Sequence, residues 1–280
     1  MPVSRSANQL LAAFEASLKL NGDAPFAAPL FAGVDLGTAY TVTAVVNADG
    51  EPVAGAMARS RSSIRDGLVL DYMGAISVLR EQVKVLHQAG FPIESAAAAY
   101  PPGTIGRNAQ TFANVLEAAG LRAVGLFDEP SAASLVLGIL DGAVVDIGGG
   151  TTGISVLQNG QVIYVADEAT GGIHLDLVIA GHYRIDTDEA EQIKTNPERQ
   201  AEIFPLVRPV FQKMASIVKH HLREHSVSDL YLVGGTSCFP GIQEVMENET
   251  GLIIERPFNP LLVTPLGIAL SCRNSMIAAN

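Results

Sequence analysis

The chain contains two segments with the same order of features, and this internal repeat limits the folds that it can adopt. The first is F-A-G-V-D-L-G-T-A-Y-T-V-T-A-V-V-N-A-D-G-E-P-V (Phe31–Val53), and the second is G-A-V-V-D-I-G-G-G-T-T-G-I-S-V-L-Q-N-G-Q-V-I-Y-V (Gly142–Val165). Each runs from an apolar strand through an aspartate and a Gly/Thr turn to a second strand, then through Asp-Gly or Asn-Gly to a third. Both dipeptides are strong hairpin signals between apolar runs. Each segment therefore predicts a three-stranded antiparallel meander, and the repeat predicts a duplicated α/β domain.

Apolar residues at helical spacing fill the rest of the chain. Residues 5–20 predict an amphipathic helix, followed by a linker with glycine and two prolines. This helix packs on its own domain or, alternatively, docks into the groove of a partner. Residues 231–235 predict a strand that enters a glycine turn. Further helices are predicted at residues 72–89, 104–119, 130–140, 187–194, 210–225, 241–250 and 264–273.

The composition argues against several classes of protein. Hydrophobic residues make up 48% of the chain and charged residues 17%, which favours a large core over intrinsic disorder. The net charge of −11 argues against general nucleic-acid binding, although Arg59, Arg61 and Arg65 leave a local basic patch open. Two cysteines without a Cys-x-x-Cys pair indicate the cytoplasm and no zinc site. We expect no membrane segment, because the longest apolar stretch, A-A-S-L-V-L-G-I-L, is too short to span a bilayer.

Three turns combine glycine with threonine: D-L-G-T-A, D-I-G-G-G-T-T and V-G-G-T-S. Glycines at a strand end let backbone N–H groups approach an anion closely, and threonine hydroxyls add donors, so the expected ligand is a phosphate. The chain has no G-K-[ST] tripeptide of the P-loop kind, and strand patterns follow the first two turns where a Rossmann turn would open a helix. Two facing hairpins would thus clamp a polyphosphate. Asp35 and Asp146, at equivalent strand ends, could hold a hydrated Mg²⁺.

Five motifs, in chain order, resemble those of the actin, sugar-kinase and heat-shock chaperone ATPase superfamily. They are the phosphate loop G-V-D-L-G-T, the connecting helix D-E-P-S-A-A-S, the phosphate loop V-D-I-G-G-G-T-T, the adenosine loop V-G-G-T-S-C-F-P-G-I and the connecting helix N-P-L-L-V-T-P-L-G-I-A-L. One such turn alone is more often only a tight turn, but here the order and spacing match over about residues 30–272. A-T-G-G-I-H-L-D (Ala169–Asp176) also resembles the chaperone branch, and R-D-G-L-V-L-D-Y (Arg65–Tyr72) resembles the bacterial rod-shape actins.

The resemblance implies an α/β, ribonuclease-H-like fold of the actin-like ATPase type. Two lobes, each a mixed five-stranded sheet with flanking helices, would enclose ATP and Mg²⁺. The first lobe would comprise residues 29–140 completed by 262–280, and the second residues 141–261. Residues 1–28 would form the separate N-terminal helix and linker.

The resemblance also implies roles for individual residues. Asp35 and Asp146 would face the metal and the phosphates, and Glu129 would lie near the γ-phosphate and position the attacking water. The residues implied to bind the nucleotide are Gly37, Thr38, Gly148, Gly149, Gly150, Thr151, Gly171, Gly172, Gly234 and Gly235.

Three departures from the family pattern concern hydrolysis more than fold. Ala39 stands where chaperone members often carry a second hydroxyl, and Gly153 stands where an aspartate usually follows. Residues 42–70 contain no lysine, which the chaperone ATPases use in this interval, and arginine is not equivalent to lysine at a catalytic phosphate. A clamp that holds ATP without cutting it efficiently is therefore an open alternative.

Simpler interpretations exist for several polar residues. Glu129 also fits an acidic residue at an exposed helix start, where acids are favoured. Cys238 fits a small loop residue. His220, His221 and His225 fit a solvated helix end, where positive charge suits the helix dipole.

The short chain fits neither a sugar kinase, which needs a larger substrate pocket, nor a chaperone with a separate peptide-binding domain. Two functions of different class follow. In the first, a chaperone or reactivase changes its grip on a client protein as nucleotide opens and closes the cleft. In the second, an actin-like structural or adaptor protein polymerises or bridges a partner assembly. A scaffold that binds no nucleotide is a third alternative.

Overall fold

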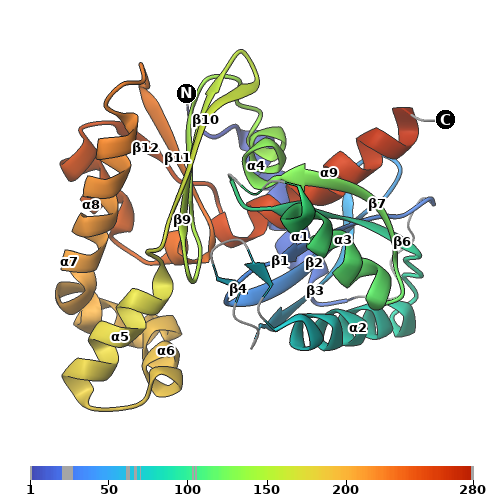
Figure 1. Ribbon diagram of the computed structural model, residues 1–280, viewed down its shortest axis with the longest axis horizontal. Coiled ribbons are helices and arrows are strands. Elements are labelled where there is room, and N and C mark those ends of the chain that lie inside the picture. The colour runs from blue at the N-terminus through green and yellow to red at the C-terminus, as the bar shows by residue number, and fades with distance from the viewer. Residues whose placement is uncertain are drawn as a thin grey trace.

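The computed structural model describes residues 2–20, 28–60, 64–65, 68–69, 71–102, 104 and 106–278. Two five-stranded sheets form the framework (Figure 1). The first sheet has the order β3-β2-β1-β6-β7, with β1 Phe31–Leu36, β2 Tyr40–Val46, β3 Pro52–Arg59, β6 Ser95–Tyr100 and β7 Arg122–Asp128. The second has the order β10-β9-β8-β11-β12, with β8 Gly142–Ile147, β9 Thr152–Gln158, β10 Gln161–Glu168, β11 Asp229–Val233 and β12 Ile253–Glu255. A two-stranded ribbon pairs β4 Ile64–Arg65 with β5 Leu68–Val69.

The two sheets confirm the predicted duplication. In each, three consecutive strands form an antiparallel meander, and the first strand of the meander also pairs in parallel with a later strand. Asp35 lies opposite Val42 in the first meander, and Asp146 lies opposite Gly153 in the second. The fold is therefore the actin-like one that the motifs imply, and it places the two aspartates at equivalent strand ends.

Helices cover both faces of both sheets. They are α1 Arg5–Ser17, α2 Tyr72–Gln88, α3 Arg107–Ala118, α4 Glu129–Leu137, α5 Gly172–Tyr183, α6 Thr187–Thr195, α7 Pro197–Leu222, α8 Ile242–Thr250 and α9 Val263–Ala278, with short 3₁₀ turns η1 Gly235–Cys238 and η2 Pro260–Leu262. Figure 1 shows α7 and α8 on the outer face of the second sheet, α2 and α3 on the outer face of the first, and α4 and α9 between the sheets.

The helical layer between the sheets is packed closely because of two glycines. A Cβ at Gly267 of α9 would lie 2.0 Å from the carbonyl oxygen of Ala132 in α4. A Cβ at Gly33 of β1 would lie 2.2 Å from the backbone nitrogen of Ala269 in α9. Only glycine permits these contacts between backbones. The packing of α9 on β1 supports our proposal that residues 262–280 complete the first lobe, with the second at 141–261.

The helix at the chain's end is long and apolar enough, over Pro260–Ala278, to pass a length-and-composition test for a membrane span. Half of that window is buried in the molecule, and the core helix of a soluble protein passes the same test. The residues from Val263 to Ala269 are all buried against other parts of the chain.

Several predicted boundaries were wrong. The helix predicted at 130–140 ends at Leu137, because Gly138 adopts a left-handed conformation (φ 67°) that caps it. The helix predicted at 210–225 spans Pro197–Leu222, and two prolines lie inside it. Its apolar face continues upstream through buried Ile203 and Val207, which extends the helix past the point where proline would be expected to stop it.

The interpretation of the three histidines as a solvated helix end was also wrong for one of them. His221 is partly buried, with its Nδ1 2.7 Å from the hydroxyl of Tyr164 and its Nε2 2.8 Å from Oε1 of Glu168. It therefore links α7 to the edge strand β10. Of the possible basic patch, Arg61, the side chain of Arg65 and the linker at residues 21–27 lie outside the described residues.

Candidate nucleotide site

The two phosphate-loop segments and the adenosine-loop segment line one cavity of about 320 Å³. The walls come from both sheets and from the α4 and α9 layer. Of the residues predicted from the sequence, the cavity is lined by Asp35, Gly37, Thr38, Glu129, Asp146, Gly148, Gly149, Thr151, Gly234 and Gly235. The fold thus brings together most of a site whose members are spread over 200 positions of the chain.

The two turns meet each other directly. A Cβ at Gly149 would lie 3.0 Å from the side chain of Ala39, and a Cβ at Gly150 would lie 3.3 Å from the side chain of Thr38. Gly150 therefore packs against the opposite turn and is not among the cavity-lining residues. Larger side chains at these positions would push the turns apart, which gives the glycines a steric reason beyond their backbone freedom.

The second turn is held from behind by hydrogen bonds to its carbonyl groups. The backbone nitrogen of Gly172 donates to the carbonyl of Gly148 (3.0 Å), and that of Ile173 donates to the carbonyl of Gly149 (2.8 Å). The hydroxyl of Thr236 also donates to the carbonyl of Gly148 (2.7 Å). These bonds fix the orientation of the peptide groups in the turn.

The predicted pair Gly171 and Gly172 lies behind this turn and outside the cavity lining. A Cβ at Gly171 would lie 2.7 Å from the carbonyl oxygen of Gly149. The pair thus allows the first turn of α5 to approach the second phosphate loop closely. The geometry supports an indirect role, in which they hold the loop that would contact the ligand.

Five acidic residues line the cavity, Asp35, Glu129, Asp146, Asp167 and Glu191, and the sequence predicted the first three. Asp35 and Asp146 are the next-to-last residues of β1 and β8, and Glu129 begins α4. Burial, with repulsion from Asp146, raises the pKa of Asp35 to about 7. Burial also raises the pKa of Asp146 to about 6, although the hydroxyl of Thr264 donates to its Oδ2 (3.1 Å) and opposes the shift. Burial, followed by repulsion from both aspartates, raises the pKa of Glu129 well above its ordinary value.

These carboxyl groups suit a hard cation that also takes ligands from a bound phosphate and from water. They do not suit a metal held by protein ligands alone. Within the described part of the chain, no group of three or more His, Cys, Asp or Glu side chains is close enough to hold a metal by itself. Mg²⁺ usually takes one or two carboxylates and completes its shell with phosphate oxygens and water. Asp35 and Asp146 fit that pattern, and a bound cation would favour the ionised forms that burial, and then repulsion between carboxylates, disfavour by raising their pKa values.

Gly234 explains how the adenosine-loop segment reaches the carboxyl groups. Its φ is +88°, and a Cβ there would lie 2.2 Å from Oδ1 of Asp146. Its nitrogen donates to the carbonyl of Pro260 (3.0 Å). Glycine is needed here for conformation and for space.

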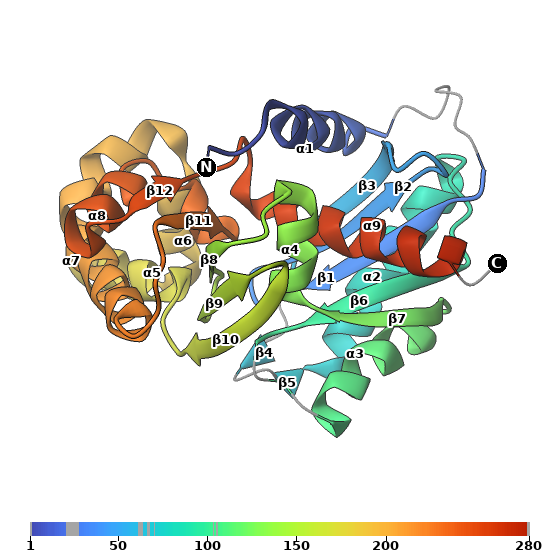
Figure 2. The same cartoon turned by 90° about the horizontal axis from the view of Figure 1, so that it is seen from above.

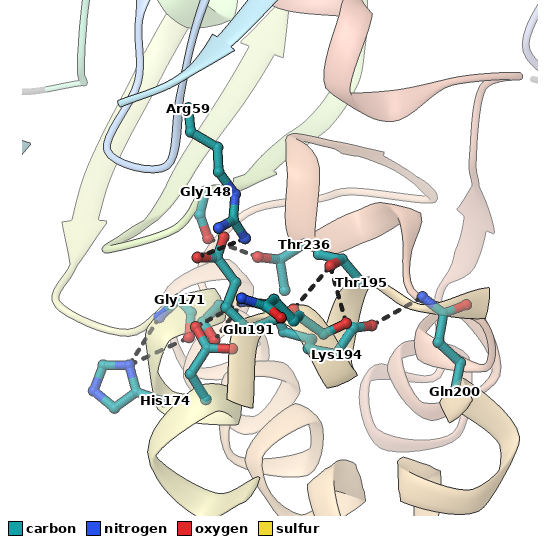
Figure 3. A network of polar contacts seen from close by, with 12 residues as sticks. Arg59, Gly148, Gly171, His174, Glu191, Lys194, Thr195, Gln200 and Thr236 are labelled. Carbon is teal, nitrogen blue, oxygen red and sulfur yellow. Dashed lines mark hydrogen bonds and ion pairs between the residues drawn. The ribbon is translucent and has the colours of Figure 1, made fainter. Parts of the chain in front are cut away.

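The sequence did not identify the polar residues that α6 adds to the cavity wall. Figure 3 shows Glu191, Lys194 and Thr195 beside Thr236 and the second phosphate loop. Lys194 Nζ lies 2.8 Å from Oδ2 of Asp176, and both side chains are largely buried. The predicted helix at 187–194 was the available signal, but helical spacing alone does not say which face of a short helix meets a cavity.

One of these α6 residues makes a contact that joins the two halves of the molecule. Arg59, the last residue of β3, forms an ion pair of 2.9 Å with Glu191 of α6 (Figure 3). Glu191 lines the cavity, so the pair lies at the cavity rim and connects its two walls. Arg59 was noted in the sequence only as part of a basic patch.

Comparison with known proteins agrees with this geometry. The model of the MreB/Mbl protein family matches residues 56–199, and that of the type IV pilus assembly protein PilM matches residues 138–265. The ethanolamine utilization protein EutJ of Escherichia coli K12 is 44% identical over 247 residues, which are 88% of this chain and 87% of that protein.

Two solved structures extend the comparison. The crystal structure of EutJ from Carboxydothermus hydrogenoformans has a TM-score of 0.88 at 46% identity, covering 95% of this chain and 99% of that one. MreB5 of Spiroplasma citri bound to AMPPNP has a TM-score of 0.70 at 15% identity, covering 90% of this chain and 99% of that one, and shows a likeness of fold. The chain therefore belongs to the family of the ethanolamine utilization protein EutJ, and its fold is that of the actin-like ATPases.

Proposed function

We propose that the chain binds ATP with Mg²⁺ in the cavity between its two sheets and acts in ethanolamine utilization in the cytoplasm. The names of its EutJ relatives support the pathway. The AMPPNP bound by MreB5, a protein of the same fold, supports an adenine nucleotide as the ligand. The geometry of the cavity supports the same choice independently.

The observation that carries the proposal is the orientation of the second phosphate loop. The carbonyls of Gly148 and Gly149 accept hydrogen bonds from the first turn of α5. In a trans peptide the C=O and the following N–H point in opposite directions. The N–H groups of Gly149 and Gly150 therefore point away from α5. Backbone donors presented together in this way suit phosphate oxygens.

The remaining roles follow from position in the cavity. Asp35 and Asp146 would hold Mg²⁺ from the two sides, where the cation would offset the charge of the phosphates. Gly234 and Gly235 would face the adenosine. Glu129 would orient the attacking water, which is a positioning role of the kind that dominates phosphoryl transfer.

A decisive experiment compares the wild type with Asp146→Ala and Glu129→Gln by calorimetric titration with Mg-ATP and by phosphate release. We expect Asp146→Ala to lose binding, because it removes a metal-side carboxylate. Glu129→Gln should keep binding and lose hydrolysis, because an amide offers the water one acceptor oxygen where a carboxylate offers two and so orients it less well. An exposed acid on α3, changed as Glu117→Gln, is the matched control. A wild-type protein that takes up no Mg-ATP would overturn the proposal.

For the cellular role, we propose a chaperone-like protein that assists assembly of the bacterial microcompartment, or that protects or reactivates ethanolamine ammonia-lyase. The ion pair between Arg59 and Glu191 supports it, because a contact across the cavity rim gives nucleotide-driven closure something to make and break. The measurement is the affinity for the lyase with ATP, with ADP and without nucleotide. Equal affinities in all three states would contradict the role.

The second candidate is an actin-like structural or adaptor protein of the microcompartment, with weak or no ATP hydrolysis. The match to the MreB/Mbl family model, which spans residues 56–199, favours it. This candidate predicts polymers, or binding to shell proteins, when nucleotide is added. Sedimentation that shows only small species, together with no shell-protein binding, would contradict it.

A further inference from the structure

The N-terminal helix α1 packs its apolar face on the first sheet. Leu11 and Phe14 are fully buried, and both belong to the core that also contains residues of β1, β2, α4 and α9. A Cβ at Gly55 of β3 would lie 2.7 Å from the ring of Phe14, so this ring lies directly on the backbone of the strand. The helix is therefore anchored to its own chain, and its apolar face is not free to dock elsewhere.

Polar contacts of α1 and of the residues just before it reach the other half of the molecule. The nitrogen of Val3 donates to Oε2 of Glu255 (3.3 Å), at the end of β12. The nitrogen of Phe258 donates to Oδ1 of Asn8 (2.8 Å). Figure 2 shows α1 extending from the region of β12 across α9 to β3. The N-terminal segment thus contacts the first sheet through the apolar face of α1 and the β12–η2 region of the other half through polar bonds.

The third polar contact leads into the cavity wall. Nδ2 of Asn259 donates to Oε1 of Glu15 (2.7 Å), while Oδ1 of the same Asn259 accepts from the nitrogen of Leu261 (3.2 Å). Leu261 lines the cavity. The neighbouring Pro260 accepts through its carbonyl from the nitrogen of Gly234. Glu15 therefore fixes the side chain that organises the turn beneath the adenosine-loop segment.

We infer that α1 is a strap between the two halves and that Glu15 is a positioning residue for the nucleoside side of the cavity. The inference that the positioned wall serves a nucleoside rests on the proposed function. The strap itself does not, because all of its contacts join residues of the chain itself. Its physical basis is preorganisation: a turn held in one conformation loses less entropy when a ligand binds.

The test uses Glu15→Ala, Glu15→Gln and the exposed helical control Glu117→Ala in the full chain. Hydrogen exchange of the nucleotide-free protein is followed in peptides that cover residues 233–239 and 258–263. Glu15→Ala should exchange about 2- to 10-fold faster there, the factor that one net hydrogen bond represents. Glu15→Gln should exchange like the wild type, because its amide oxygen still accepts from Asn259. Glu117→Ala should be unchanged, and all three should unfold at nearly the wild-type temperature.

Release of a fluorescent ATP analogue gives a second reading. Glu15→Ala should release it about 2- to 10-fold faster, while Glu15→Gln should not. Unchanged exchange in Glu15→Ala, or an equal defect in Glu15→Gln, would overturn the strap. Faster exchange in Glu15→Ala in a protein whose wild type binds no ATP would uphold the strap and refute only its link to a nucleoside.

Discussion

The carboxyl groups of Asp35, Asp146 and Glu129 in the cavity should lower the stability of the protein when no nucleotide or metal is bound. Asp35 has its pKa raised from 3.8 to about 7 by burial and by the charge of Asp146. The carboxyl group of Asp35 therefore binds a proton more tightly in the folded protein than in the unfolded protein. The contribution of Asp35 to the stability of the folded chain is therefore most favourable below about pH 4 and is lost as the pH rises toward 7. Asp35→Asn, which cannot ionise, should escape this loss.

The magnitude follows from the pKa difference. At about 1.4 kcal/mol per pKa unit, the values of 3.8 and about 7 set an upper bound of roughly 4 kcal/mol at pH 8. Asp35 lies at the cavity wall and is partly exposed, so solvent screening lowers the expected gain for Asp35→Asn to about 1–2 kcal/mol. For a chain of this size that corresponds to a rise of about 2–8 °C in the unfolding temperature.

The assay is thermal unfolding without nucleotide at pH 4, 6 and 8. The gain of Asp35→Asn should be absent at pH 4, intermediate at pH 6 and full at pH 8. Glu117→Gln, on the surface of α3, should show no such trend. With saturating Mg-ATP the order should reverse, because only the wild type keeps both metal-side carboxylates. An unfolding temperature for Asp35→Asn at or below that of the wild type at pH 8 would refute the reasoning.

Three further substitutions probe other contacts of the cavity. Gly234→Ala should lower the free energy of unfolding by about 1–3 kcal/mol and abolish nucleotide binding. The φ of +88° at this position is strained for alanine, and the added Cβ would meet Asp146. Thermal unfolding measures the first effect and calorimetric titration the second. Arg59→Ala should change stability by less than about 1 kcal/mol but speed nucleotide release in stopped flow, because it removes the ion pair with Glu191. Thr264→Ala should raise the pKa of Asp146 above about 6, so Mg-ATP should bind more weakly than to the wild type at pH 6.5 and equally at pH 8.

Each substitution has a matched control. Gly181→Ala changes a helical glycine whose added Cβ would meet nothing within 4 Å, and it should be harmless. Arg199→Ala breaks an ion pair with Glu202 within the second half and should leave nucleotide release unchanged. Thr264→Ser keeps the hydroxyl and should behave like the wild type at both pH values. A release rate unaffected by Arg59→Ala, or a pH-independent defect in Thr264→Ala, would contradict the corresponding prediction.

The sequence predicted what depends on local chemistry. Asp-Gly and Asn-Gly turns located both meanders, and the glycine turns located the cavity walls, because each signal lies within a few neighbouring residues. Helix ends were less well predicted where tertiary packing overrode local preference, as in α7, whose buried face extends past Pro209 and Pro205. Glu129 could be either a surface residue or a cavity residue on sequence alone, since only the packing of α4 decides which way its first turn faces.

What the sequence could not show are the contacts that join the two halves, because each joins residues far apart in the chain. Three examples are the pairs Arg59–Glu191, Thr264–Asp146 and Glu15–Asn259. All three are polar, so breaking any one costs about 1 kcal/mol or less where water can replace the partner. The α4 and α9 layer is different, because its buried side chains would expose apolar surface if separated, at about 25 cal/mol for each Å². Opening of the cavity should therefore break these polar contacts and keep the α4 and α9 layer intact. That layer is then the axis about which the two halves turn.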